Sequence, residues 1–304
     1  MSTPSRSAST PERNHVDSDD DAVVAPRPTG PSGVRASSAV QWDVTVLAPP
    51  GGDRWTTWDE LGVSHGPQPR PSWVITSGEA FDTELGILKS GKEADVHLIE
   101  RTGPDGACLL AAKRYRGADH RLFRRDDAYQ AGRRHQKSRQ RRAIANRSTF
   151  GRGLIAGMWA EAEWLALCRL WGSGVRVPYP VSHDGEELLM EFIDDGLGHA
   201  APRLAQSRPG PEALAALWEQ FRLVVLTLAE DGFAHGDLSP YNLLVTASNE
   251  LVVIDLPQLV DVTVNPQGIE FLHRDVMNVS RWFVARGAAE GGEELFAEAL
   301  ARLY

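Results

Sequence analysis

One segment of the sequence, HGDLSPYNLLVTASNELVVIDLP, constrains the fold more than any other. It reads as a β-hairpin in which two apolar runs flank the turn ASNE. Asp237 and Asn242 precede the first run, and Asp255 follows the second. Turn-forming residues at a surface would explain each of the three on its own. Their common position at the open end of one hairpin points instead to a shared chemical role.

The register of the hairpin brings the polar groups together. If Thr246 pairs with Leu251, the antiparallel ladder places Asn242 opposite Asp255, and facing residues lie about 5 Å apart. An amide oxygen and a carboxylate are ligands that suit Mg²⁺. A separate carboxylate, that of Asp237, can accept a proton from an attacking hydroxyl.

A lysine lies on an apolar strand upstream of this hairpin. The stretch ELGILKSGKEADVHLIE predicts a strand, a glycine-containing turn and a strand, and CLLAAKRYR predicts a third strand. Leu109, Ala111 and Lys113 share one face of that strand. Lys113 either reaches solvent near the strand end or pairs with a buried anion.

A predicted helix from about 155 to 172 offers such an anion. Its apolar stripe comprises Trp159, Ala166, Leu167 and Leu170. Glu163 falls inside this stripe, whereas Glu161 falls outside it. A carboxylate on an apolar face is costly unless it pairs with a cation, so we expect Glu163 to pair with Lys113. The alternative is that Glu163 lies at the edge of the stripe and reaches water.

Together these residues match the needs of phosphoryl transfer. That reaction uses a Lys on the nucleotide phosphates, an Asn and an Asp on the metal, and a second Asp at the attacking hydroxyl. The ordered set of strand Lys, helix Glu, His-Gly-Asp, Asn and Ile-Asp therefore predicts a phosphotransferase.

The same motifs resemble one family. LKSGKEADV, HGDLSPYNLL and IDLPQLV are similar to the nucleotide loop, catalytic loop and metal loop of the RIO family of atypical serine/threonine protein kinases. WAEAEW, APRL and EFLHRDVMNVSRWF also resemble this family. The resemblance covers about residues 72–304 and implies an α+β, bilobal protein-kinase-like fold. We expect a small antiparallel-sheet N-lobe at about 72–190 and a reduced, mostly helical C-lobe at about 194–304.

The resemblance implies ATP and Mg²⁺, or Mn²⁺, as cofactors and assigns roles to residues. Asp237 is the expected catalytic base, and Asn242 and Asp255 are the expected metal ligands. The expected catalytic set is Asp237, Lys113, Glu163 and Asp255. The expected nucleotide-binding set is Ser90, Gly91, Lys92, Glu93 and Lys113, with Met190, Glu191 and Ile193 in the hinge that faces adenine.

The rest of the chain indicates where the folded domain begins and in which compartment the protein is expected to act. Residues 1–40 are rich in Ser, Pro and Asp and are expected to be disordered, and 41–71 form a poorly defined linker or accessory region. No apolar run is long enough for a membrane helix, and the N-terminus lacks the apolar stretch of a signal peptide. The two cysteines have no paired spacing, which fits a reducing cytoplasm.

A basic segment suggests partners beyond a protein substrate. Residues 121–152 hold eleven Arg and Lys side chains and two acidic ones, so RNA or a ribosomal particle is a candidate partner. Ser138, Ser148 and Thr149 in this segment are candidate autophosphorylation sites. The sequence gives no oligomeric state.

Two alternatives to a protein kinase stay open. Small-molecule kinases of the aminoglycoside or choline type share H-G-D-x-x-x-x-N but usually carry a larger helical region after the metal Asp, whereas only 47 residues follow Pro257. The second alternative is an ATPase that acts as a nucleotide-operated binding module, with phosphorylation of Asp255 as part of its cycle.

Overall fold

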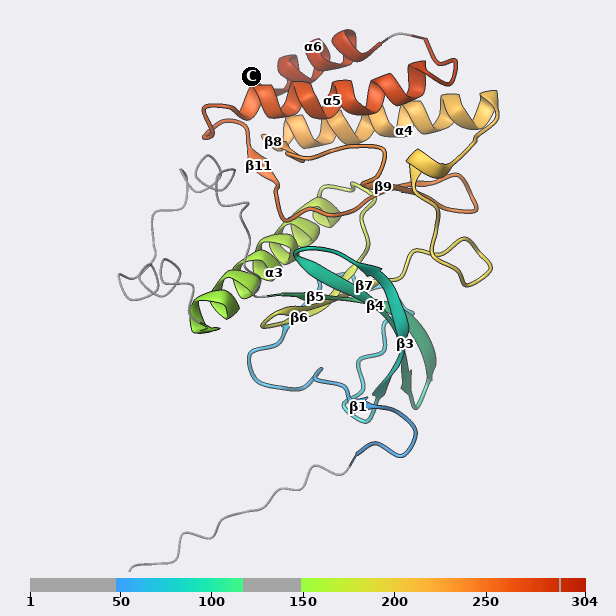
Figure 1. Cartoon of the computed structure of the whole chain (residues 1–304), viewed down its shortest axis with the longest axis vertical. Coiled ribbons are helices and arrows are strands. Elements are labelled where there is room, and N and C mark those ends of the chain that lie inside the picture. Colours follow the sequence, from blue (N-terminus) through green and yellow to red (C-terminus); the bar gives the residue numbers. More distant parts are fainter. Residues whose placement is uncertain (1–47, 117–148, 290) are drawn as a thin grey trace, which may run out of the picture. The chain divides into compact units, whose positions relative to one another are not determined.

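The computed structural model describes residues 48–116, 149–289 and 291–304, all of which belong to the unit Leu47–Tyr304. The predicted disordered tail, 1–40, and most of the basic segment, 121–148, lie outside the described residues. Within the unit, a sheet and a group of helices form two lobes with helix α3 beside the sheet (Figure 1). This is the α+β arrangement that the resemblance predicts.

The N-lobe is a seven-stranded antiparallel sheet with the order β1-β3-β4-β5-β7-β6-β2. Its strands are β1 (Arg54–Trp55), β2 (Ser64–His65), β3 (Phe81–Ser90), β4 (Ala94–Gly103), β5 (Gly106–Tyr115), β6 (Pro180–Asp184) and β7 (Glu187–Glu191). Alternation along β5 buries Leu110 and Ala112 in an outer apolar cluster and Ala111 in the main core of the C-lobe side. The sheet therefore packs on both faces.

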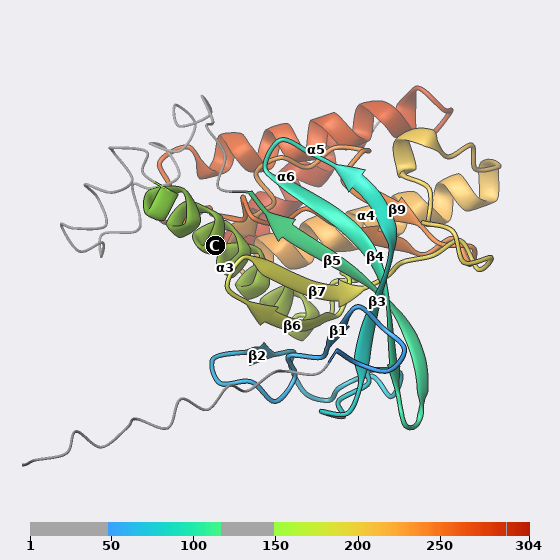
Figure 2. The ribbon, with the colours of Figure 1, turned by 60° about the horizontal axis from the view of Figure 1, so that its bottom comes forward.

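Residues N-terminal to the predicted domain boundary belong to this sheet. The kinase domain was expected to begin at about residue 72, but β1 pairs with β3 at one edge of the sheet and β2 pairs with β6 at the other. Trp58, between the two strands, is buried in the outer cluster and stacks on His65. Strands of two residues have no sequence periodicity, which explains why the pattern did not reveal them. Their pairing covers both edges of the sheet (Figure 2).

Helix α3 (Thr149–Gly172) packs against β5, β6 and β7. It begins six residues before the predicted start at 155. Ala160, Leu167 and Leu170 are buried, and Glu161 is exposed, so the predicted helical phase is confirmed. The buried face carries Glu163 toward the space between the lobes.

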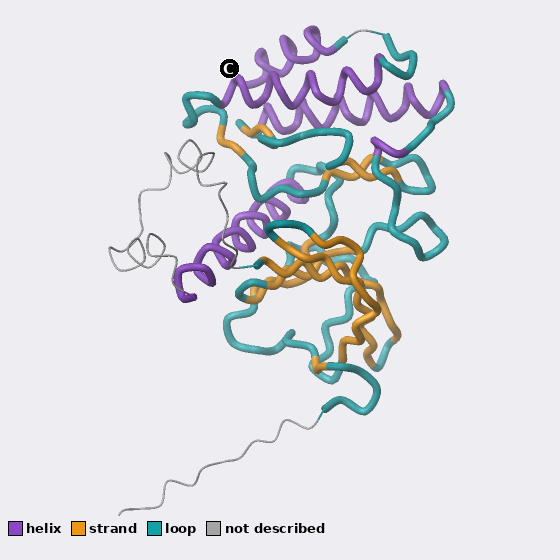
Figure 3. The backbone as a smooth tube through the Cα atoms, in the orientation of Figure 1, coloured by secondary structure: helices purple, strands orange, loops and turns teal. Residues whose placement is uncertain are grey.

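The C-lobe is built from three helices and two small ribbons (Figure 3). Its elements are η1 (Leu204–Gln206), α4 (Pro211–Glu230), β8 (Phe233–Ala234), β9 (Leu243–Val245), β10 (Leu251–Val253), β11 (Val260–Asp261), α5 (Gly268–Val284) and α6 (Gly292–Leu303). Strand β8 pairs with β11, and β9 pairs with β10. The two ribbons thus bring the segment after β8 beside the segment after β10.

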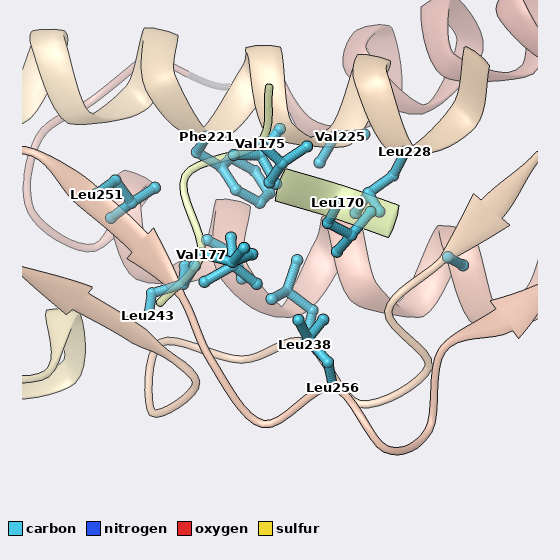
Figure 4. Close-up of a cluster of buried hydrophobic side chains, with 14 of the residues drawn as sticks. Leu170, Val175, Val177, Phe221, Val225, Leu228, Leu238, Leu243, Leu251 and Leu256 are labelled. Atoms are coloured by element: carbon cyan, nitrogen blue, oxygen red, sulfur yellow. The ribbon is translucent and has the colours of Figure 1, made fainter. Parts of the chain in front are cut away.

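A continuous apolar core connects α3 to the C-lobe. Leu170 of α3 packs with Phe221 and Leu228 of α4 in this core, beside Leu238 and Leu256 (Figure 4). The last two residues lie within the predicted catalytic loop and metal loop, directly after Asp237 and Asp255. Both loops are therefore anchored by buried side chains immediately next to their polar groups.

Arg101 and Asp82 form a buried ion pair in the sheet, and we predict that Arg101→Ala destabilises the protein by about 3 kcal/mol. The Arg101 Nε and Nη2 atoms donate to the two Asp82 oxygens at 2.7 and 3.0 Å, and both residues are 1% exposed. Removing the guanidinium leaves the Asp82 carboxylate buried, with Arg54 at 3.4 Å as its remaining cation.

Urea denaturation measures this loss. The matched control is Arg302→Ala, which removes an exposed ion pair with Glu230 and should cost about 1 kcal/mol or less. Equal, small losses for both variants would contradict the structural weight given to the buried pair.

Candidate active site

A cavity of about 510 Å³ lies between the two lobes. The sheet contributes Val96, Ala111 and Lys113, and α3 contributes Glu163. The C-lobe contributes Leu244, Ile254 and Asp255. Apolar walls with a few charged groups at one end are typical of a small-molecule site.

Glu163 is the centre of the charged end. Its carboxylate is 2% exposed, and its Oε1 atom accepts hydrogen bonds from Lys113 Nζ at 2.8 Å and from the Leu256 amide at 3.2 Å. The Tyr115 hydroxyl donates to Oε2. The contact expected between Glu163 and Lys113 is present, and the same carboxylate also holds the segment after Asp255.

Lys113 lies between two carboxylates. Its Nζ atom also donates to Asp255 Oδ1 at 2.8 Å. Burial by itself would lower the pKa of Lys113, but the charges of Glu163 and Asp255 raise that pKa well above its ordinary value. The Lys113 ammonium in turn holds the pKa of Asp255 at about 2 against the opposing effect of burial. Both groups are therefore charged at neutral pH.

Tyr115 supports this arrangement as a donor. Burial and the neighbouring Glu163 charge raise the pKa of Tyr115 well above its ordinary value. The phenol therefore keeps its proton and donates a hydrogen bond to the Glu163 carboxylate.

The hairpin register differs by one residue from the prediction. Leu251 pairs with Val245 rather than Thr246, so Asn242 faces Ile254, whose amide donates to the Asn242 carbonyl at 3.0 Å. The reason is a longer turn: Thr246 and Glu250 close it, and Asn249 takes a left-handed φ of 58° inside it. The prediction that Asn242 lies opposite Asp255 in the ladder is therefore wrong.

Asp255 lies one residue beyond the hairpin in a left-handed conformation with φ of 68°. Few residues other than Gly adopt this conformation, although Asp and Asn tolerate it better than most. The turn directs the carboxylate back toward Lys113 and the cavity. Backbone conformation, rather than strand register, thus places Asp255 in the site.

Asp275 of α5 fixes the loop that carries Asp237. Its two carboxylate oxygens accept the Gly236 and Leu238 amides at 2.7 and 2.9 Å. Gly236 has a φ of 87°, and a Cβ there would lie 2.4 Å from the Gln258 carbonyl oxygen. The loop therefore needs glycine at this position, and the Asp275 carboxylate holds the amides on either side of Asp237.

His235 ties the same loop to the end of the hairpin. Its Nε2 atom lies 3.1 Å from the Ile254 carbonyl oxygen, and its Nδ1 atom lies 3.4 Å from the Asp237 amide nitrogen. A carbonyl only accepts and an amide N–H only donates, so these contacts select the neutral tautomer protonated at Nε2. Because His235 is 1% exposed, its role is to connect the two loops and not to contact a substrate.

Asp237 and Asn242 are linked through the backbone. The Asn242 Nδ2 atom donates to the Asp237 carbonyl at 2.9 Å, so the amide oxygen of Asn242 is the atom that can face a cation. Asn242 is buried, whereas Asp237 is exposed. The exposed carboxylate is accessible to a large substrate.

The glycine-containing loop forms part of the cavity wall. Gly91, Lys92 and Glu93 line the cavity. The hydroxyl of Ser90, which was also expected to bind nucleotide, instead accepts a hydrogen bond from Arg116 Nη2 at 3.0 Å. That contact ties Ser90 to Arg116, the residue after β5, and Ser90 is not among the residues that line the cavity.

The predicted hinge residues Met190, Glu191 and Ile193 also line the cavity. The Glu191 side chain is held by both terminal nitrogens of Arg176 at 2.7 Å. Its carboxylate is thereby neutralised, so the hinge presents backbone groups rather than a negative charge to the cavity.

Three residues of the site were not singled out from the sequence: Tyr115, Asp275 and Lys89. Asp275 could have been found by the argument used for Glu163, because it lies among Leu272, Val276 and Val279 on the buried face of α5. Lys89 lines the cavity because of a local irregularity of its strand that no periodicity predicts.

The comparison with known proteins identifies the family. The family model described as "RIO domain" matches residues 109–295. The chain belongs to the RIO family. The RIO-type serine/threonine-protein kinase Rio1 of Haloferax volcanii is 35% identical over 221 residues, covering 71% of this chain and 68% of that relative.

Eukaryotic relatives agree with this assignment. The serine/threonine-protein kinases RIO3 of Caenorhabditis elegans and RIO1 of Chaetomium thermophilum are each 28% identical over 211 residues. The chain spans about two fifths of their length, with 38% and 39% covered. The predicted family, kinase-like fold and enzyme class, a RIO-type serine/threonine protein kinase, are confirmed by these matches.

We predict that Glu163→Gln destabilises the free protein by about 2–3 kcal/mol, because it breaks a buried ion pair while Lys113 keeps Asp255 as a partner. Glu161→Gln, two residues away on the exposed face of α3, should change stability by about 0.5 kcal/mol or less. Urea denaturation compares the two variants. A larger loss for Glu161→Gln would show that the charged centre is assigned to the wrong carboxylate.

Proposed function

We propose that this RIO domain transfers the terminal phosphoryl group of ATP to Ser/Thr hydroxyls of a protein, itself included, with Mg²⁺ or Mn²⁺ as the metal. The observation that carries the proposal is that Lys113, on the wall of the cavity between the lobes, contacts both Glu163 and Asp255 at 2.8 Å. In phosphoryl transfer, such a set positions the phosphates and stabilises their charge.

The donor atoms fit a hard divalent cation. Asp255 offers a carboxylate that is ionised at neutral pH, and Asn242 offers an amide oxygen. Among the described residues, no group of three or more His, Cys, Asp or Glu side chains forms a metal site, so phosphates and water would complete the coordination. The bound metal would supply charge neutralisation between the phosphates.

The protein's own residues account for the other tasks. Lys113, held by Glu163, would contact the inner phosphates, and the hinge residues 190–193 would accept adenine through their backbone. Asp237 would hold the acceptor hydroxyl and take its proton as the phosphoryl group moves. Asp275 and His235 hold the backbone of the loop that carries this carboxylate.

A protein acceptor is favoured over a small alcohol. The relatives are named as protein kinases, and the Asp237 carboxylate is exposed at the surface of the C-lobe. The names of the relatives do not favour the alternative of an ATPase that works as a nucleotide-operated binding module. RNA binding by the basic segment 121–152 remains a prediction.

Location in the cytoplasm is also part of the proposal. Cys108 and Cys168 are free thiols, which agrees with a reducing compartment. No helix among the described residues is long and apolar enough to cross a membrane.

We predict that Asp237→Ala keeps ATP binding within about 3-fold but lowers phosphoryl transfer by about 10²-fold or more, which is the contribution of a positioned base. Transfer is measured with γ-labelled ATP and a generic protein acceptor, and binding is measured by calorimetry. Transfer by Asp237→Ala at the wild-type rate would remove Asp237 from this role.

The chemical stability of the labelled product separates the two candidate functions. We expect an acid-stable phosphate ester on Ser or Thr after incubation with γ-labelled ATP and Mg²⁺. Label that hydroxylamine releases from an aspartyl residue, with no phosphate ester, would instead favour the ATPase. Peptide mapping of the label also tests autophosphorylation at Ser138, Ser148 or Thr149.

A further inference from the structure

A β-bulge in β3 turns Lys89 toward the cavity. Ile87 pairs with His97 on β4, but Lys89 pairs with Val96, so Leu88 is an extra residue in β3. In a regular ladder Lys89 would share the outward face of Ile87, which is 63% exposed. The extra residue reverses that direction, and Lys89 lines the cavity together with Leu88.

The bulge places Lys89 in one cross-strand row with Lys113. Val96, the partner of Lys89, is also the partner of Lys113 on β5. Residues paired across neighbouring strands point to the same face, and two strand spacings separate the Cα atoms of the two lysines by about 10 Å. Two long, flexible side chains at that separation can contact different phosphates of one triphosphate.

The charges of the two lysines are compensated differently. Lys113 Nζ already contacts two carboxylates at 2.8 Å, whereas Lys89 makes no ion pair or side-chain hydrogen bond within the described ranges. Partial burial in the cavity wall lowers the pKa of Lys89, and the charges of Arg203 and Lys113 act in the same direction against that of Asp255. A bound anion would relieve this repulsion.

The strand order sets which phosphate each lysine meets. The hinge follows β7, which lies beside β5 in the sheet. Strand β4 lies beyond β5, and β3 lies beyond β4, so Lys89 on β3 is two strands farther from the hinge than Lys113 on β5. A nucleotide with adenine at the hinge therefore passes Lys113 first and Lys89 last. Lys89 also directly precedes the loop Ser90–Glu93, whose Gly91, Lys92 and Glu93 line the cavity.

We infer that Lys89 is a further phosphate-binding lysine, besides Lys113 and the expected Lys92, and that it contacts the terminal phosphate of ATP, the group that is transferred. The inference rests on the proposed ATP-dependent function. It gives this loop, which lacks the multiple glycines of ordinary kinase loops, a side-chain cation in place of backbone amides.

Calorimetric binding of Mg-ATP, Mg-ADP and adenosine to the full chain tests the inference. Lys89→Ala should weaken ATP binding by about 10-fold or more, the scale of a hydrogen bond to a charged group. ADP binding should weaken by about 3-fold or less, and adenosine binding should be unchanged. Lys89→Arg should restore most of the ATP affinity.

The controls address charge and folding. Arg281→Ala removes the same charge from the exposed face of α5, away from the cavity, and should bind all three ligands like wild type. Thermal unfolding should be unchanged in Lys89→Ala, because the side chain lies in an exposed part of β3.

Each remaining outcome decides against the inference in a distinct way. Lys89→Ala could weaken the binding of ATP and ADP equally, or weaken neither, while the wild-type protein binds ATP. Either result overturns the contact with the terminal phosphate but leaves the proposed function standing. If Arg203→Ala weakens ATP binding more than ADP binding and Lys89→Ala does not, the contact with the terminal phosphate belongs to Arg203 instead. Absence of ATP binding by wild type overturns the proposed function and this inference together.

Discussion

The buried carboxylate of Glu163 is the constraint on which the site depends. A carboxylate that is 2% exposed needs compensating donors, and two other parts of the chain supply three of them. Strand β5 gives Lys113 and Tyr115, and the segment after Asp255 gives the Leu256 amide. Satisfying one charge thus joins α3, the sheet and the metal loop, and it brings Lys113 within 2.8 Å of Asp255.

A second buried carboxylate does the same for the C-lobe. Asp275 accepts the two amides that flank Asp237, while His235 connects this loop to the Ile254 carbonyl. The backbone on both sides of Asp237 is therefore held by buried contacts, and its carboxylate stays exposed. The two centres meet at the open end of the β9–β10 hairpin, where Asn242 directly precedes β9 and Asp255 follows β10.

The sequence was sufficient to predict the elements with strong patterns and the residues with unusual chemistry. The phase of α3 and the pairing of Glu163 with Lys113 follow from periodicity and from the cost of a buried charge. The hairpin register failed by one residue because the turn is closed by Thr246 and Glu250, which the turn residues alone do not reveal. Asp255 reaches the site through a left-handed φ, and Lys89 through a bulge, and neither leaves a periodic signal.

The central claim is that Glu163 serves the nucleotide site through Lys113. A double-mutant cycle on the Kd for Mg-ATP, with Glu163→Gln, Lys113→Met and the double variant, tests it most directly. The account predicts strong non-additivity, with a coupling of about 1–3 kcal/mol, because the loss of Lys113 removes most of what Glu163 contributes. Additive effects of the two substitutions would contradict it and would show that the two residues act on the nucleotide independently.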